Sequence, residues 1–90
     1  MIEVKYSGDN EWLVTVNGAV TTQHRVRVTV PEIDHLAQGR PVEELLQESF
    51  RFLLEREPNT SILPSFGLIL IGRYFPEYQQ EIRLRLAKQP

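Results

Sequence analysis

The chain of 90 residues contains no cysteine, so disulfide bonds, thiolate metal ligands and a cysteine nucleophile are excluded within it. Long hydrophobic runs are also missing: the longest, Leu68–Ile71, is far too short to cross a bilayer as a helix. Residues 2–5 alternate apolar and charged side chains, unlike a signal or transit peptide. The lack of cysteine suits a reducing compartment, and we expect a cytoplasmic protein without membrane attachment.

The sequence also lacks an excess of charge of one sign. It has 10 Lys and Arg residues against 12 Asp and Glu residues, and its net charge is −2. This balance disfavours a general nucleic-acid binder, although it leaves room for a local basic patch. Hydrophobic residues make up 41% of the chain, which predicts a folded globule rather than a disordered segment. At this length we expect residues 1–90 to form one domain.

Residues 2–30 show the two-residue alternation that is typical of half-buried strands. Turn-forming residues at positions 7–10 and at Asn17-Gly18 divide this region into three segments. The pattern therefore predicts a three-stranded antiparallel meander. Its apolar face is predicted to carry Ile2, Val4, Tyr6, Trp12, Val14, Val16, Val26, Val28 and Val30. The opposite, outer face is predicted to carry Glu3, Lys5, Thr15, Arg25 and Arg27.

Two helices are predicted after the meander. Residues Pro31–Gln38 can form a short helix that stops at Gly39, because glycine tolerates the left-handed conformation common at helix ends. A longer helix over Val42–Glu57 lies between Pro41, which suits a first helical turn, and Pro58, which cannot continue a helix. We expect its apolar stripe to cover the sheet. The stripe consists of Val42, Leu45, Leu46, Ser49, Phe50, Leu53 and Leu54.

The C-terminal third allows two local interpretations. Ser65 can cap a short helix that includes Leu68–Ile71, whereas glycines on both sides of that run leave a strand as the alternative; we favour the helix. Pro76 fits the first turn of a last helix. The apolar side of that last helix is predicted to carry Phe75, Tyr78, Ile82 and Leu86. The predicted fold class is α+β: a three-stranded antiparallel β-meander covered by a long amphipathic helix, followed by one or two C-terminal helices.

Residues that could support catalysis or metal binding are sparse. The only histidines, His24 and His35, lack the HxxxH or HExxH spacing of metal sites, so no metal or other cofactor is expected. Ser49 lies within the apolar stripe, and its hydroxyl is expected to bond to the carbonyl four residues earlier rather than act as a nucleophile. We expect no enzymatic activity. The acidic residues of the long helix are expected to be solvated: Glu43, Glu44, Glu48, Glu55 and Glu57.

Aromatic residues near Pro76 are candidates for contact with a protein partner. Tyr74, Phe75 and Tyr78 cluster there, and interface anchors are often aromatic, although packing within the core is the alternative interpretation. Leu84 lies away from the apolar side of the last helix and is a further candidate. We predict a homodimer through this helix or through the strand Ile2–Tyr6, which is an edge strand if strand order follows the sequence.

Basic residues suggest a second kind of contact. Lys5, Arg25 and Arg27 share the predicted outer face of the sheet and are candidates for an anion or nucleic-acid site. No aromatic residues alternate with them, unlike the base-stacking platforms of RRM and OB folds. Arg56 projects near the stripe of the long helix. Its guanidinium is expected to tie the helix end to the following loop or to the last helix, with an anion site as the alternative.

Several phrases of the sequence resemble a group of small prokaryotic proteins of about this length. The phrases are SFRFLLEREP at 49–58, SIL at 61–63, SF at 65–66 and YFPEY at 74–78, and the resemblance spans residues 28–82. The group has no assigned activity, substrate or cofactor. The resemblance implies a bacterial or archaeal source, an intracellular setting and no catalytic role. Gly67 stands where an acidic residue is expected in the group, which weakens the helix predicted between Phe66 and Ile71.

These observations predict a small non-enzymatic interaction or regulatory protein whose partner is a protein, including a second copy of itself. The alternative is a nucleic-acid-binding regulator that uses the face formed by Lys5, Arg25 and Arg27.

Overall fold

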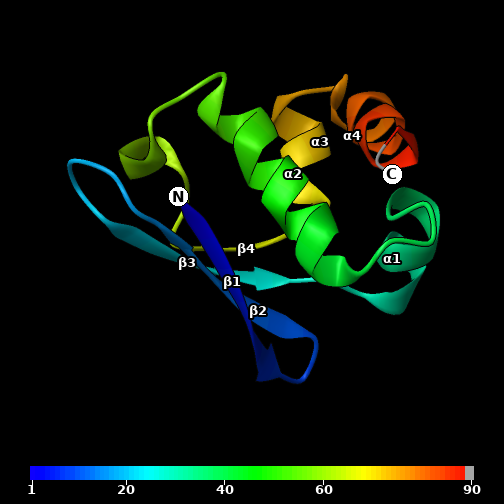
Figure 1. Cartoon of the computed structure of the whole chain (residues 1–90), viewed down its shortest axis with the longest axis horizontal. Coiled ribbons are helices and arrows are strands. Elements are labelled where there is room, and N and C mark those ends of the chain that lie inside the picture. Colours follow the sequence, from blue (N-terminus) through cyan, green and yellow to red (C-terminus); the bar gives the residue numbers. More distant parts are fainter. Residues whose placement is uncertain (89–90) are drawn as a thin grey trace.

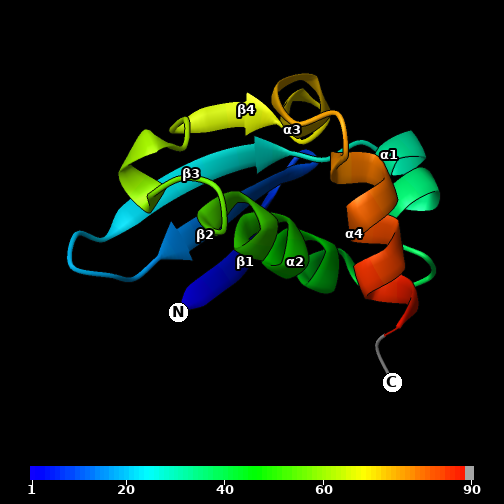
Figure 2. The ribbon, with the colours of Figure 1, turned by 90° about the horizontal axis from the view of Figure 1, so that it is seen from above.

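The computed structural model describes residues 1–88, which form an α+β fold with a four-stranded mixed sheet (Figure 1). The strands are β1 (Ile2–Gly8), β2 (Glu11–Val16), β3 (Thr22–Arg27) and β4 (Ser65–Gly67). The helices are α1 (Val30–Leu36), α2 (Val42–Leu54), α3 (Leu70–Tyr74) and α4 (Tyr78–Ala87), with a 3-10 turn η1 (Asn59–Ser61). Helix α2 crosses one face of the sheet, while α1, α3 and α4 gather beyond the end of the strands (Figures 1 and 2). No helix among residues 1–88 has both the length and the apolar character that spanning a membrane requires.

The antiparallel meander predicted from the alternation is confirmed. Strands β1 and β2 pair from Ile2↔Val16 to Tyr6↔Trp12, and β2 and β3 pair from Glu11↔Arg27 to Val16↔Thr22. The β1–β2 turn passes through residues 8–10, which all have positive φ, a conformation that Gly, Asp and Asn tolerate better than other residues. The period of two therefore places one set of side chains beneath α2 and the other on the open outer face.

A fourth strand was not predicted. β4 runs parallel to β3 and pairs with it at Arg25↔Ser65, Val26↔Phe66 and Arg27↔Gly67. The helix predicted to begin at Ser65 is therefore wrong, because Ser65 lies in the strand and the helix α3 begins only at Leu70. Strand β4 hydrogen-bonds to the edge of β3 that β2 does not occupy. Local sequence patterns could not show that this edge was available. The Arg25 N–H donates to Pro64 O at 2.8 Å at the start of β4.

Helix α2 is shorter than predicted at its C-terminus. It ends at Leu54, and a turn over residues 55–57 follows, in which the Glu57 N–H donates to Leu53 O at 2.9 Å. Pro58 disfavours the helical conformation of the residue before it, so the last predicted turn does not form as a regular helix. The stripe packs against the sheet as expected, and Phe50 and Leu53 are buried.

Two buried residues of α2 lie outside the predicted stripe. Phe52 is fully buried because the rings of Phe75 and Tyr78 enclose it at centroid distances of 5.9 and 5.3 Å. Glu48 is also buried, with its carboxylate in an ion pair with Arg51, so the prediction that Glu48 is solvated is wrong. Helix α2 therefore buries two sides, one against the sheet and one against α4.

The apolar face of the sheet ends earlier than predicted. Val30 is 59% exposed because the chain has already left the sheet and Val30 is the first residue of α1, after a capping box formed by Thr29 and Glu32. Tyr6 is 55% exposed at the turn end of the β1–β2 hairpin, where it packs against Trp12 at 4.9 Å. Helix α1 ends at Leu36, two residues before the predicted end at Gln38. Gln38 already has a positive φ of 54°, and the predicted stop residue Gly39 follows with a φ of 77°.

The last helix packs by the side predicted for it. Tyr78, Ile82 and Leu86 are fully buried. The helix begins only at Tyr78, so the prediction that Pro76 occupies its first turn is wrong, and the half-buried Phe75 lies in the segment before it. Ser49 Oγ donates to Leu45 O at 2.7 Å, which confirms the predicted back-bond, and lies 2.7 Å from Tyr78 Oη. Because the single Ser49 proton is used by the carbonyl, the Tyr78 hydroxyl donates to Ser49. This buried hydrogen bond joins α2 to α4.

Candidate protein-binding groove

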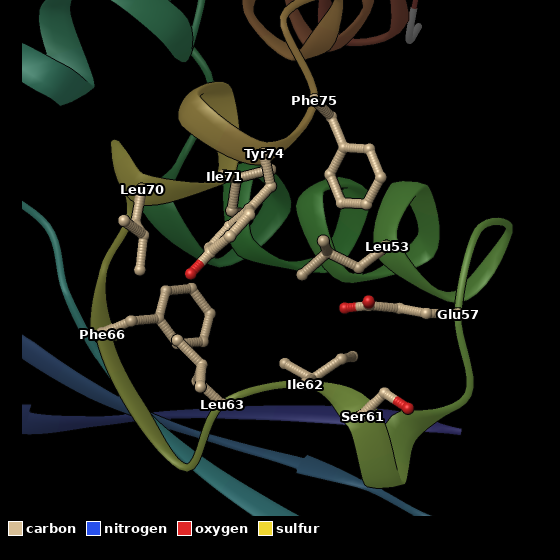
Figure 3. A pocket seen from close by; sticks show the side chains of 10 residues that line it. All are labelled: Leu53, Glu57, Ser61, Ile62, Leu63, Phe66, Leu70, Ile71, Tyr74 and Phe75. Carbon is tan, nitrogen blue, oxygen red and sulfur yellow. The ribbon is translucent and has the colours of Figure 1, made fainter.

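An open groove with a volume of about 440 Å³ lies between the C-terminal end of α2, the segment 61–66 and α3 (Figure 3). Its volume falls within the range of roughly 300–1,000 Å³ that is usual for ligand sites in proteins. The side chains that line it are Leu53, Glu57, Ser61, Ile62, Leu63, Phe66, Leu70, Ile71, Tyr74 and Phe75. Most are apolar, so the groove favours an apolar ligand.

The floor of the groove is part of the hydrophobic core. Leu53, Ile62, Phe66 and Ile71 are all buried, and they come from α2, the η1–β4 link, β4 and α3. Phe66 reaches this position because its pairing with Val26 places it on the inner face of the sheet. The floor is therefore assembled from segments that are far apart in the sequence, and the pairing of β4 with β3 decides its shape.

Hydrogen bonds from the sheet fix the η1–β4 link beside the groove. His24 is buried, and its Nδ1 lies 2.7 Å from Leu63 O while its Nε2 lies 2.8 Å from Thr22 Oγ1. Asn59 Nδ2 donates to Val20 O at 2.7 Å and to Thr22 Oγ1 at 3.0 Å. Because both ends of the link are held, Leu63 has a fixed place on the rim.

Large apolar side chains stay exposed on the rim of the groove. Tyr74 is 66% exposed and Leu63 is 43% exposed, while Leu70 and Phe75 are half-buried. Ile69, which precedes α3, is 55% exposed. Apolar side chains gathered in this way are typical of interaction sites, whereas single exposed leucines need no explanation.

One carboxylate enters the groove without a partner. Figure 3 shows the Glu57 side chain directed into the space between Leu53 and Ile62. No residue among 1–88 forms a hydrogen bond or an ion pair with this carboxylate. A carboxylate beside apolar walls favours a ligand that carries a positive charge next to an apolar group.

The neighbouring carboxylates differ from Glu57 because arginines already bind them. Arg85 Nη2 lies 2.6 Å from Glu55 Oε1, and Arg56 Nε lies 3.2 Å from Glu77 Oε2. The hydrogen bond from Arg85 holds the pKa of Glu55 below its usual value. Glu57 is therefore distinguished from these acidic neighbours by its place in the groove and its free carboxylate.

Arg56 adopts the structural role suggested by the sequence. Its Nη1 donates to Phe52 O at 3.0 Å, its Nε pairs with Glu77, and its guanidinium lies 3.5 Å from the centroid of the Phe52 ring. It thus ties the end of α2 to the residue that precedes α4. These contacts use the guanidinium within the chain, so Arg56 does not contribute an open anion site to the groove.

The candidate partner residues of the C-terminal region separate in the structure. Tyr74 and Phe75 line the groove. Tyr78 is fully buried between α2 and α4, so it belongs to the core and offers no surface to a partner. Leu84 is 48% exposed on α4 and lines a separate depression together with His35. The structure therefore brings only part of the predicted set together.

The basic residues predicted on the outer sheet face are exposed and do share that face. Lys5 and Arg25 both lie opposite Leu13 on β2, and Arg27 lies opposite Glu11. The face also carries Glu3. No aromatic residue of the described strands lies on it, because Trp12 and the residues paired with it, Tyr6 and Val26, are on the inner face. Without rings for base stacking, this face lacks the main contact of single-strand nucleic-acid platforms.

The structure gives no support to the remaining candidates for metal binding or catalysis. Over residues 1–88, no group of three or more His, Asp or Glu side chains is placed to hold a metal ion. His35 is exposed, and its Nε2 lies 3.4 Å from Gln79 Oε1. The other histidine, His24, is occupied by separate hydrogen bonds. The Ser49 hydroxyl is fully buried and engaged on both sides, so it cannot reach an external substrate.

Among the residues that line the groove, sequence reasoning named only Tyr74 and Phe75 as partner candidates, and it missed the others, including Leu63 and Glu57. Leu63 and Glu57 flank the link after α2, and nothing in the local pattern shows that α3 folds back beside them. The Pro58 that follows Glu57 is the one local signal, since it predicts an extended exit from the helix. No family model matches the chain, and neither a curated protein nor a solved structure is detectably similar to it. The resemblance to the prokaryotic group thus stays a prediction.

Proposed function

We propose that this protein is a small non-enzymatic interaction module that binds a partner protein in the groove. The partner segment inserts an apolar side chain and places a Lys or Arg beside it. The observation that carries the proposal is the free Glu57 carboxylate next to the exposed side chains of Tyr74 and Leu63.

The exposed rim favours a protein ligand over a small molecule. A small ligand would be enclosed by its pocket, whereas Tyr74 and Leu63 project from the rim of an open groove. Tyrosine is enriched among the residues that dominate binding energy at protein interfaces. A partner side chain on the groove floor would leave these rim residues to cover it and to exclude water.

The Glu57 carboxylate would select among partner segments that carry an apolar anchor. A segment with Lys or Arg next to its apolar anchor would form a charge-assisted hydrogen bond with Glu57, and such bonds contribute more than neutral ones. A segment with Asp or Glu at that place would bring two carboxylates together in a partly apolar site, which is unfavourable. The groove therefore supplies both affinity and discrimination.

Peptides selected from a randomised display library provide the test. We expect wild-type protein to select peptides with an aromatic or aliphatic residue followed closely by Lys or Arg. Tyr74→Ala should weaken the best peptide at least about tenfold, as loss of an interface anchor does. Glu57→Gln should weaken that peptide but not its counterpart in which norleucine replaces the basic residue. Isothermal titration calorimetry measures each affinity.

The matched control is Val20→Ala. Val20 is 58% exposed in the β2–β3 connection and lies outside the groove, so its truncation removes exposed apolar surface without touching the proposed site. Val20→Ala should bind the peptide as the wild type does. Selected peptides that bind Tyr74→Ala and Glu57→Gln with undiminished affinity would show that the groove is not the binding site.

A further inference from the structure

Strands β1 and β4 are the two edges of the sheet (Figure 2). The hydrogen bonds at the start of β1 define which of its backbone groups are unpaired. The Asn17 N–H donates to Met1 O at 2.8 Å, and the Met1 amino group donates to Asn17 O at 3.2 Å. Because bonded pairs alternate in an antiparallel ladder, the odd-numbered residues of β1 bond to β2. The N–H and C=O groups of Val4 and Tyr6 therefore point to the free edge.

A contact from α2 confirms this alternation independently. Gln47 Nε2 donates to Ile2 O at 2.7 Å, so this carbonyl points away from β2, as it must for an even-numbered residue. The Gln47 side chain satisfies one group of the edge, at the end of the strand. The backbone groups of Val4 and Tyr6 and the Ile2 N–H are left without a partner in the sheet.

The side chains of this strand form a self-complementary pattern. The order Ile2-Glu3-Val4-Lys5-Tyr6 has an acidic and a basic residue on either side of Val4. A two-fold rotation through Val4 therefore sets Glu3 of one copy opposite Lys5 of the other. We propose that β1 pairs in antiparallel orientation with β1 of a second copy, centred on Val4, so that the two sheets become continuous.

The charges meet at the positions where side chains approach most closely. With Val4 facing Val4 as a bonded pair, Glu3 and Lys5 form non-bonded pairs, whose side chains lie nearest to each other on the outer face. The Lys5 ammonium has no partner among residues 1–88. Glu3 uses Oε2 for the Asn17 side chain at 2.5 Å, and its Oε1 can receive Lys5 of the second copy.

The inner face gains a contact in the same register. Ile2 of one copy lies opposite Tyr6 of the other, and Tyr6 is 55% exposed in the single chain. The backbone contributes a bond in each direction between the two Val4 residues and from each Ile2 N–H to a Tyr6 carbonyl. Polar, charged and apolar contacts thus all agree on one register, as an isologous two-fold contact requires.

This pairing leaves the groove open. The groove lies beside β4, at the opposite edge of the sheet from β1. A dimer through β1 would therefore carry one open groove at each end of the continuous sheet. Two linked grooves would bind a partner with two matching segments more tightly than one groove does, without any new contact.

Charge reversal at the edge tests the proposal. Sedimentation velocity across a wide range of protein concentration should show a monomer–dimer equilibrium for the wild type. Glu3→Lys and Lys5→Glu each replace both attractions with repulsions of like charges, so each should raise the dissociation constant at least about tenfold. Mixing these two variants should restore a dimer of one copy of each, because every facing pair is again of opposite charge.

Gln23→Glu is the control, since Gln23 is exposed on the same outer face but lies on β3, away from the edge. It should dimerise like the wild type, and circular dichroism should show all variants folded. The proposal is overturned by a wild type that stays monomeric throughout, by a Lys5→Glu variant that dimerises unchanged, or by a mixture that forms no dimer. Loss of the dimer in Leu84→Glu alone would instead place the contact on α4.

Discussion

Tyr74 and Tyr78 stand on either side of the segment Phe75–Glu77, and they have opposite surroundings. Tyr78 is fully buried, and its hydroxyl bonds to Ser49. Tyr74 is 66% exposed on the rim of the groove. Both residues read as members of one aromatic cluster around Pro76. The comparison shows that an aromatic cluster marks apolar surface, but the packing of neighbouring elements decides which member stabilises the fold and which is free to bind.

The backbone between the two tyrosines explains the difference. Helix α3 ends at Tyr74, the next residue Phe75 is extended with a φ of −129°, and α4 begins at Tyr78. The chain changes direction between them, so the two residues do not share a helical face despite their helical spacing. Tyr78 turns toward α2, where Phe52 packs against its ring, while Tyr74 stays with α3 above Phe66 (Figure 3).

The largest effect should come from removing a ring on the buried side. Phe52→Ala deletes a fully buried side chain enclosed by Phe75 and Tyr78, and it should lower the free energy of unfolding by roughly 3–5 kcal/mol. Tyr74→Ala should change it by less than about 0.5 kcal/mol. Urea unfolding followed by circular dichroism measures both. Equal losses in the two variants would show that Tyr74 is as much part of the core as Phe52.

Alkaline pH should destabilise the folded protein through the buried Tyr78 hydroxyl. Burial raises the pKa of Tyr78 well above its usual value of 10.0. Above that pH the unfolded chain loses this proton while the folded protein keeps it, so the folded state is disfavoured. The free energy of unfolding should fall by roughly 1.4 kcal/mol per pH unit between about pH 10 and 12 through this group. Comparing unfolding of wild type and Tyr78→Phe isolates it, and identical slopes would contradict the assignment.

The hydrogen bond between α2 and α4 should have an intermediate effect. Ser49→Ala leaves the buried Tyr78 hydroxyl without its acceptor, which should destabilise the protein by roughly 1–3 kcal/mol. Adding Tyr78→Phe removes the stranded hydroxyl, so the double variant should lose less than the sum of the single variants. A double-mutant cycle from denaturant unfolding gives this coupling, and strict additivity would mean that the two hydroxyls do not interact.

The smallest expected effects compare a paired with an unpaired carboxylate at the end of α2. Glu77→Gln breaks an exposed ion pair with Arg56 and should destabilise by about 0.5–1 kcal/mol at most. Glu57→Gln removes a charge that has no partner among the described residues and should leave stability within about 0.5 kcal/mol. Thermal unfolding at low salt measures both changes. A clear loss of stability in Glu57→Gln would reveal a structural role and weaken the case for the groove.

Local periodicity determined a large part of the fold. The two-residue alternation in residues 2–27 was enough to predict the meander and to place Val14 and Val26 inside, because strand side chains alternate regardless of what covers them. Proline positions and the 3.6-residue period likewise predicted α2 and the buried side of α4. The predicted Ser49 back-bond also depends only on helix geometry, and it is confirmed.

Only the tertiary structure decided the rest, because it depends on contacts between residues that are distant in sequence. Strand β4 exists because β3 has a free edge, and no local pattern in Ser65–Gly67 reveals that edge. The burial of Phe52 required α4 to pack on the second side of α2. The groove arises where these long-range choices meet, so the sequence alone could list its aromatic residues but could not place Glu57 beside Tyr74.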